Sequence, residues 1–292
     1  MHHAMPVIVG VPRSGTTLLR MMIDAHPDVA IPPETGFLPA LADLDTNQDA
    51  SERAGRIITT FDTWPDFGLD AAELRQTLDH LSPITPADAA RTFYKEYAAR
   101  FGKSRWGDKT PTYGASLDRI ASLLPEARFV HIIRDGRDVL VSVRGLWFRP
   151  GDTVEACAQD WMTRLAHTRA LGAHVSHYLE VRYEALVHDS TATLQEICRF
   201  LDLRFDPEML TYYLRSSQRL GEHQARYAPD GQVLVSKADR IRNQRFVMQP
   251  PQAERIGRWQ SELSDDDVRR FEAVASEWLH RLGYGVQTRT VC

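Results

Sequence analysis

The sequence predicts an α/β fold in which a central parallel sheet lies between two layers of helices. Short β-rich runs alternate with helical patterns along the 292 residues, which is typical of parallel sheets with helical crossovers. The run around His131-Ile132-Ile133 is apolar on both faces, as expected of a central strand. A composition of 43% hydrophobic and 25% charged residues suffices for one large core. We expect a single domain over residues 1–292.

Four runs are expected to form the sheet. They are Pro6–Val9, Arg105–Gly107, Arg128–Ile133 and Tyr178–Val181. Residues from about 35 to 102 have the pattern of several short helices and predict a helical lobe beside the sheet. Residues from about 215 to 251 are polar, dotted with aromatic residues and weakly periodic, which predicts a loop-rich segment over the site. Ser264 and the aspartates after it predict the start of the last helix, and Gly283 its end.

Net charge and cysteine content narrow the class of protein. The formal net charge of −4 gives no reason to expect a nucleic-acid partner, so an anion site has to be a local cluster. Cys157, Cys198 and Cys292 are far apart and odd in number, which favours a reducing compartment over a disulfide framework. No segment approaches 18 continuous apolar residues, and the N-terminus lacks a signal-peptide pattern. We therefore expect a cytoplasmic protein without a membrane span.

The strongest local signal is a glycine-bearing loop between the first strand and a helix. Gly10 and Gly15 have the spacing of a P-loop, which presents backbone N–H groups and a helix N-terminus to a phosphate. Thr16 stands where nucleotide-hydrolysing P-loops have lysine, and Arg13 brings a positive charge into the loop instead. A tight turn without a ligand is the alternative. The run of polar residues favours a P-loop-type fold with an anion site.

The loop also resembles a known family. Pro12-Arg13-Ser14-Gly15-Thr16-Thr17 is similar to the loop that binds the 5′-phosphosulfate in sulfotransferases dependent on 3′-phosphoadenosine-5′-phosphosulfate (PAPS). The continuation through Asp24-Ala25-His26-Pro27 to Pro33-Glu34-Thr35 resembles the tyrosylprotein sulfotransferase branch and its bacterial relatives. The resemblance implies that these six loop residues bind the donor, with Arg13 nearest the transferring group.

A second anion site is predicted where a strand runs into a helix. Arg134 at the carboxyl end of the strand and Ser142 about two turns into the helix can converge on one phosphate. Taken alone, the segment also fits a surface network in which Arg134 and Arg137 pair with neighbouring aspartates. It resembles the family's 3′-phosphate motif, in which the arginine and the serine eight residues later hold that phosphate.

Two further segments resemble the family. Arg182-Tyr183-Glu184 at a strand end is similar to a motif that implies Tyr183 near the nucleotide. The run Arg255-Ile256-Gly257-Arg258-Trp259 resembles the region that closes over the nucleotide, which implies roles for Arg255 and Gly257. Gly257 stands where the tyrosylprotein branch has a serine, and a glycine cannot supply that side-chain contact.

The candidates for the chemistry are Glu34, Lys109 and the loop residue Arg13, with His26 as an alternative base. Glu34 aligns with the branch's catalytic glutamate, which implies a general base, whereas its position alone also fits the start of a helix. His26 is the alternative base, and its place at a helix end favours a structural role. Lys109 lies in a segment similar to the family's Lys-x-Pro run, which implies contact with the sulfuryl oxygens; a surface lysine is the alternative.

The resemblance implies a sulfotransferase that moves a sulfuryl group from PAPS to a hydroxyl by in-line transfer and releases PAP. No His/Cys cluster or Asp-rich loop has metal spacing, so no metal is expected. The acceptor stays open among small molecules, glycans, lipids and peptides, as does the oligomeric state. Two other functions also stay open. One is a P-loop metabolite or nucleoside kinase, for which the loop lysine is missing; the other is a non-catalytic PAP-binding module, against which Arg13, Glu34 and Lys109 count.

Overall fold

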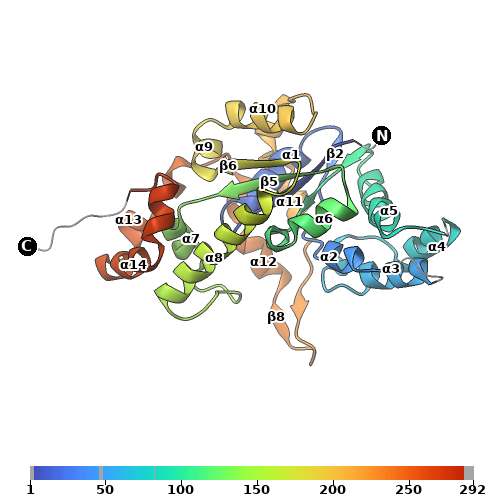
Figure 1. Ribbon diagram of the computed structural model, residues 1–292, viewed down its shortest axis with the longest axis horizontal. Helices are drawn as coiled ribbons and strands as arrows, with labels where there is room; N and C mark the ends of the chain where they lie inside the picture. The colour runs from blue at the N-terminus through green and yellow to red at the C-terminus, as the bar shows by residue number, and fades with distance from the viewer. Residues whose placement is uncertain (1–2, 46–48, 82, 286–292) are drawn as a thin grey trace, which may run out of the picture.

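The main sheet of the computed structural model, which describes residues 3–45, 49–81 and 83–285, has four parallel strands (Figure 1). They are β1 (Met5–Val9), β4 (Asp108–Lys109), β5 (Ala127–Ile133) and β6 (Tyr178–Arg182), in the order β4-β1-β5-β6. The register places Ile8 of β1 between Lys109 of β4 and Val130 of β5. The predicted α/β class with a central parallel sheet is confirmed.

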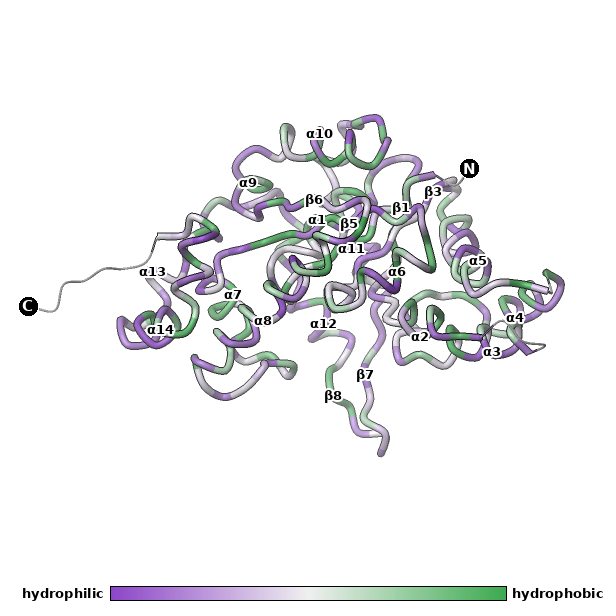
Figure 2. Tube along the Cα trace, in the orientation of Figure 1, coloured by the Kyte–Doolittle hydropathy of each residue, from purple (hydrophilic) through white to green (hydrophobic). Residues whose placement is uncertain are grey.

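Helices cover both faces of this sheet, which makes three layers. Val7, Val9 and Phe129 pack into one apolar core, while Ile8 and Val130 pack into the opposite core. On the first side lie α6 (Leu117–Leu123) and α8 (Val154–Gly172), and on the second α1 (Thr16–Asp24), α9 (Tyr183–His188) and α10 (Ser190–Phe200). Figure 2 shows the hydrophobic centre of the molecule as a green stretch along β5.

The expected strand at 105–107 was wrong in its bounds. The structure has β3 (Arg105–Trp106), which pairs with β2 (Val29–Ala30) in a separate small sheet, and the main sheet gains β4 only after Gly107. A Cβ at Gly107 would lie 2.6 Å from the side chain of Pro6. The chain passes from the small sheet to the main sheet at this residue. It is a glycine because a larger residue would not fit against Pro6.

A helical lobe follows Glu34 along the chain. Its helices are α2 (Leu38–Ala42), α3 (Ala50–Thr59), α4 (Ala71–His80) and α5 (Pro86–Ala99). Their buried faces share one core with β1, built around the edge-on rings of Phe37, Phe67 and Phe93. Because lobe and sheet share this core, Glu34 is held at a fixed position beside the sheet.

The chain from residue 213 to 255 lies over one side of the sheet's carboxyl edge and is called the covering segment here. It contains α11 (Tyr213–Leu220), a hairpin of β7 (Arg226–Tyr227) and β8 (Val233–Val235), and α12 (Lys237–Asn243). Figure 1 shows the hairpin projecting from the body of the molecule. The segment therefore holds two helices and a hairpin where the sequence indicated mainly loop.

The remaining described elements surround these parts. They are α7 (Gly136–Val143), α13 (Trp259–Glu262), α14 (Asp265–Arg281) and five 3₁₀ helices at Trp64–Asp66, Pro111–Ala115, Pro207–Thr211, Arg245–Met248 and Ala253–Arg255. The predicted ends of α14 are confirmed, since Ser264 accepts the N–H of Asp267 and Gly283 has a φ of 71°. None of the described helices is long and apolar enough to cross a membrane. Cys157 and Cys198 are free and buried, and Cys292 lies outside the described residues.

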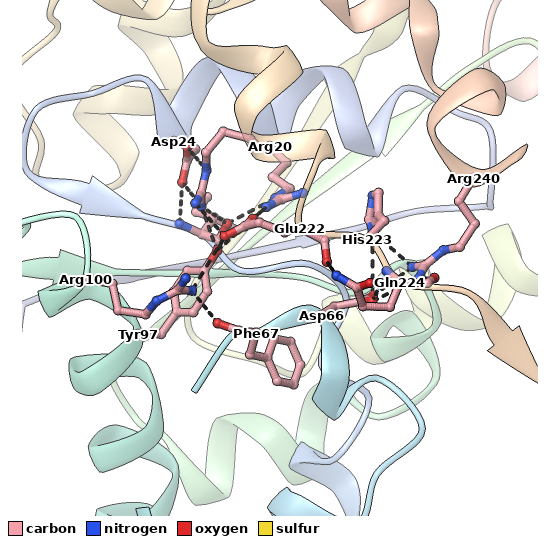
Figure 3. A network of polar contacts seen from close by, with 12 residues as sticks. Arg20, Asp24, Asp66, Phe67, Tyr97, Arg100, Glu222, His223, Gln224 and Arg240 are labelled. Atoms are coloured by element: carbon pink, nitrogen blue, oxygen red, sulfur yellow. Dashed lines mark hydrogen bonds and ion pairs between the residues drawn. The ribbon is translucent and has the colours of Figure 1, made fainter. Parts of the chain in front are cut away.

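A buried ionic network ties α11 to α1 and to the lobe (Figure 3). Arg219 forks onto Asp24, with Nε–Oδ2 at 2.8 Å and Nη2–Oδ1 at 2.9 Å. Arg219 also donates to Glu222 at 2.9 Å, and the Tyr97 hydroxyl donates to the same carboxylate at 2.9 Å. This network anchors the start of the covering segment in the core.

Candidate functional site

A cleft at the carboxyl edge of the sheet gathers most of the predicted donor-binding residues. Its cavity volume is about 90 Å³. Its lining includes the predicted residues Arg13, Gly15, Thr16, Thr17, Arg134, Ser142, Tyr183 and Arg255. These residues follow β1, β5 and β6 or come from the covering segment, and ligands of open parallel sheets bind at this edge.

The loop after β1 is shaped for an anion. Gly15 precedes α1 with a φ of 101°, and no side chain of the described residues caps this helix, so the N–H groups of its first turn are available. A Cβ at Gly15 would lie 2.4 Å from the ring of Tyr183. The loop and the end of β6 therefore approach as closely as they do because residue 15 is a glycine.

Arg13 lies in this loop with a φ of 75°, a costly conformation for a residue other than glycine. Its Nε donates to Ser142 Oγ at 3.0 Å, and its Nη2 donates to the Asn243 carbonyl at 3.0 Å. Burial, together with the charges of Arg255 and Arg134, lowers the pKa of Arg13 to about 10. The guanidinium groups of these three arginines repel one another, so an anion in the cleft is stabilised.

Arg134 and Ser142, the predicted 3′-phosphate pair, lie in the same cleft. The Arg134 guanidinium sits over the ring of Tyr183, 4.2 Å from its centre, and Nη2 donates to the Arg255 carbonyl at 2.5 Å. Arg134 Nε is buried without a partner in the described chain, as is the hydroxyl of Ser14. An unpaired buried donor is costly, and of these two only Arg134 lines the cleft, where a phosphate would satisfy it.

The alternative of a salt-bridge network is right in its pairings, Arg134 with Asp138 at 3.5 Å and Arg137 with Asp135 at 2.7 Å, but wrong in placing them on the surface, because these side chains are buried. Arg137 also donates to Glu272 at 2.6 Å, and it stacks on Trp259. Asp138 accepts the N–H groups of Trp259 at 3.0 Å and of Gly257 at 2.8 Å. The ion pairs of this helix fix the last part of the chain against the sheet.

Three of the predicted donor-binding residues do not line the cleft. The N–H of Gly257 donates to Asp138, and the loop residue Ser14 is buried. Pro12 lines a neighbouring pocket instead. A glycine and a proline have no side-chain donors, so the motif alone did not indicate which way their backbones face.

That neighbouring pocket, of about 380 Å³, is called the acceptor-side pocket here. It shares Arg13, Thr16 and Thr17 with the donor cleft. Its own lining includes Glu34, Trp147, Phe148, His223, Arg226 and Arg240. Two pockets thus meet at the loop residues, with a carboxylate on one side and the arginine cluster on the other.

Glu34 and Lys109 form an ion pair at this junction, with Oε1 2.5 Å from Nζ. The Glu34 side chain is 47% exposed and that of Lys109 only 2%. Burial alone would raise the pKa of Glu34, but the charge and hydrogen bond of Lys109 lower it below the ordinary value. Glu34 is therefore a carboxylate at neutral pH and can accept a proton. Lys109 lines neither pocket and lies behind Glu34, and its own pKa is lowered by burial.

His26, the alternative base, lies in neither pocket. Its Nδ1 accepts the N–H of Asp28 at 3.0 Å, and its Nε2 faces the Arg204 carbonyl at 2.9 Å. Both ring nitrogens are engaged in holding the turn after α1. The geometry thus favours the structural interpretation of His26.

The sequence placed the segment of about 215–251 over the site but did not indicate which of its residues line the donor cleft. Phe246, Val247, Pro250 and Pro251 line it, and the guanidinium of Arg255 lies 3.6 Å from the ring centre of Phe246. Aromatic residues in a polar, weakly periodic stretch were the available signal. Among the described residues, no three His, Cys, Asp or Glu side chains group as metal ligands.

Comparisons with known proteins agree with this geometry. A model of the sulfotransferase family matches residues 7–207. The protein-tyrosine sulfotransferase 1 of Danio rerio is 29% identical over 290 residues, covering 96% of this chain and 72% of that protein. The nodulation protein NoeE of Sinorhizobium fredii is 27% identical, covering 95% of this chain and 65% of its own length.

Solved structures show the same fold. The sulfotransferase domain of the Synechococcus PCC 7002 olefin synthase superposes with a TM-score of 0.59 at 24% identity, covering 94% of this chain and 96% of that domain. The resemblance to the tyrosylprotein branch and to bacterial sulfotransferases is confirmed by these relatives. Since the family model matches more than half of the residues, the chain belongs to the sulfotransferase family.

Proposed function

We propose that this protein transfers a sulfuryl group from PAPS to a hydroxyl of an acceptor by in-line displacement. The observation that carries the proposal is the junction of the two pockets at Arg13, Thr16 and Thr17, with Glu34 on the acceptor side. The acceptor oxygen forms a bond to sulfur as the sulfur–oxygen bond to the 5′-phosphate breaks. The acceptor's proton passes to Glu34, and PAP leaves with the electron pair.

Different residues bind the two ends of the donor and assist the transfer. The first turn of α1 and Arg13 hold the 5′-phosphosulfate, and Arg134 with Ser142 holds the 3′-phosphate. Lys109 pairs with Glu34 and lines neither pocket in the free protein, so its proposed contact with the sulfuryl oxygens requires its side chain to leave Glu34 once the donor is bound. This exchange removes the cation that lowers the pKa of Glu34, so the base becomes stronger when the donor is in place.

Donor identity is tested by ligand-induced stabilisation. PAP is expected to raise the melting temperature of the protein, because a ligand that binds only the folded state stabilises it. ATP with Mg²⁺ is the matched control, since Thr16 replaces the lysine on which P-loop kinases depend. Stabilisation by ATP–Mg²⁺ without stabilisation by PAP would contradict the proposal and favour a kinase.

The 3′-phosphate contact is tested by two variants. Arg134→Ala and Ser142→Ala are expected to weaken binding of PAP at least about tenfold more than binding of AMP, since a lost hydrogen bond to a charged group costs roughly 1.5–3 kcal/mol. Isothermal titration of both ligands measures this ratio. Arg56→Ala, which removes an exposed arginine on α3, is the control. Equal losses for PAP and AMP would show that these residues do not bind the 3′-phosphate.

The acceptor is proposed only as a molecule bearing a hydroxyl. The named relatives include protein-tyrosine sulfotransferases, whose acceptor is a phenol. Trp147 and Phe148 give the acceptor-side pocket an aromatic wall, and such a wall suits a ring or another apolar group beside the hydroxyl. A cytoplasmic location stays a prediction from the sequence.

A further inference from the structure

His223 lies beside the acceptor-side pocket and has no part in the mechanism above. It follows α11, its backbone N–H donates to the Leu220 carbonyl at 3.2 Å, and it is 2% exposed. It lines the same pocket as Glu34. Figure 3 shows its ring beside Arg240 and Asp66, at the end of the covering segment's buried network.

The neighbours of His223 determine where its ring proton sits. An Arg240 Nη2, which can only donate, lies 3.0 Å from His223 Nδ1. Nδ1 therefore accepts and carries no proton, which leaves the ring proton on Nε2. Asp66 Oδ2 lies 3.6 Å from Nδ1, beyond hydrogen-bond distance.

Asp66 does not need the imidazole, because other donors satisfy its buried carboxylate. Arg226 donates to Oδ2 at 2.6 Å, Arg240 donates at 2.8 Å, and the N–H of Gln224 donates to Oδ1 at 2.7 Å. Burial lowers the pKa of His223 to about 4, consistent with a neutral ring. Arg240, itself paired with Asp66, thus holds the ring at its Nδ1 edge.

The Nε2 of His223 is buried and has no hydrogen-bond partner among the described residues. An N–H group left without a partner is costly, and such groups in folded proteins are usually explained by a ligand, a water or a functional role. We propose that His223 Nε2–H donates a hydrogen bond to the acceptor molecule, at the reacting hydroxyl or at an oxygen next to it. The proposal rests on the proposed function, since it deepens the acceptor side of that site.

Two substitutions separate this role from a structural one. In His223→Asn the amide oxygen stands near the position of Nδ1 and can still accept from Arg240, but the Nε2–H is lost. In His223→Gln the amide nitrogen stands near the position of Nε2, while the acceptor for Arg240 is lost. We expect kcat/KM for the acceptor to fall about tenfold in the asparagine variant, as for one lost hydrogen bond, and to fall less in the glutamine variant.

The measurement uses labelled PAPS with 4-methylumbelliferone as the probe acceptor, and PAP titration of each variant. His131→Asn is the control: it removes a buried imidazole whose Nε2 is also unpaired but which lies on β5, outside the acceptor-side pocket. It is expected to keep kcat/KM per folded enzyme. The opposite ranking, with asparagine the better variant, would assign His223 to anchoring Arg240 and overturn the proposal.

A second measurement does not depend on turnover. In ¹⁵N-histidine-labelled protein, the His223 signals, assigned by their loss in His223→Asn, are expected to show the Nε2–H tautomer at pH 7. Addition of PAP and the probe phenol should shift the Nε2–H resonance. An Nδ1–H tautomer would overturn the proposal even if the enzyme is active. Failure of the wild type to bind PAP would instead contradict the proposed function.

Discussion

Glu34→Gln is expected to lower kcat at least about 100-fold, the low end for a lost general base. Glutamine keeps the size of the side chain and a hydrogen-bond acceptor but cannot take the acceptor's proton. Because Glu34 lines the acceptor-side pocket and not the donor cleft, PAP affinity should stay near that of the wild type. Steady-state rates with labelled PAPS and PAP titration measure the two quantities.

The pH profile of the wild type provides a second test of the base. Lys109 lowers the pKa of Glu34 below the ordinary value of 4.5. As the pH falls, Glu34 therefore stays mostly ionised down to pH 4.5 and takes up its proton only below it. The acid limb of kcat/KM for PAPS, which reports the free enzyme, should therefore lie below pH 4.5. An acid limb near the ordinary imidazole pKa would point to a histidine as the base.

Lys109→Met is the companion variant. It is expected to lower kcat by removing charge from the sulfuryl oxygens, and to raise the pKa of Glu34 in the free enzyme by removing its cation. The acid limb of kcat/KM should move to higher pH in this variant and vanish in Glu34→Gln.

If Glu34→Gln turns over at nearly the full rate, another group is the base. If it loses PAP binding or unfolds, Glu34 is structural.

Asp24→Asn is expected to lower the free energy of unfolding by about 3 kcal/mol, the low end for removing one partner of a buried ion pair. Arg219 is nearly fully buried, and the substitution takes away the charge to which its guanidinium forks. The Asp24 carboxylate also accepts the N–H of Ile31 at 2.8 Å, on the stretch that leads to Glu34. Urea denaturation of both proteins measures the difference.

Glu52→Gln is the matched control for that prediction. It removes an exposed carboxylate that pairs with Arg56 along α3, and such pairs contribute about 0.3–0.5 kcal/mol. A loss in Asp24→Asn no larger than in Glu52→Gln would show that the buried network contributes little to stability. The covering segment would then be held mainly by its apolar contacts.

Much of the donor site could be predicted from the sequence because its signals are local. The apolar runs of β1, β5 and β6 have the length of strands, and most of the residues proposed to bind the donor, namely the loop residues, Arg134 and Tyr183, follow these strands directly. Gly15 could be predicted because it ends the loop and a helix begins at the next residue. Such motifs depend on neighbours along the chain.

The rest depends on contacts between distant residues. β4 consists of Asp108 and Lys109, two charged residues that are buried because Tyr94 and Glu34 bond to them. Charged residues carry no strand signal in a sequence, so the expected strand was placed at 105–107. His223 is likewise ordinary in the sequence, and its unpaired Nε2 becomes visible only once Arg240 is seen at Nδ1.

The most direct test of the central claim is sulfuryl transfer itself. The wild type, incubated with ³⁵S-PAPS and a mixed set of phenols, alcohols, glycans and tyrosine-containing peptides, is expected to release PAP and to place the label on an acceptor hydroxyl. The labelled product should be identified by mass spectrometry, and its formation should fall at least about 100-fold in Glu34→Gln. Labelling at the same rate in both proteins would contradict the role of Glu34. Transfer of phosphate from ATP, with no transfer of sulfur from PAPS, would contradict the account as a whole.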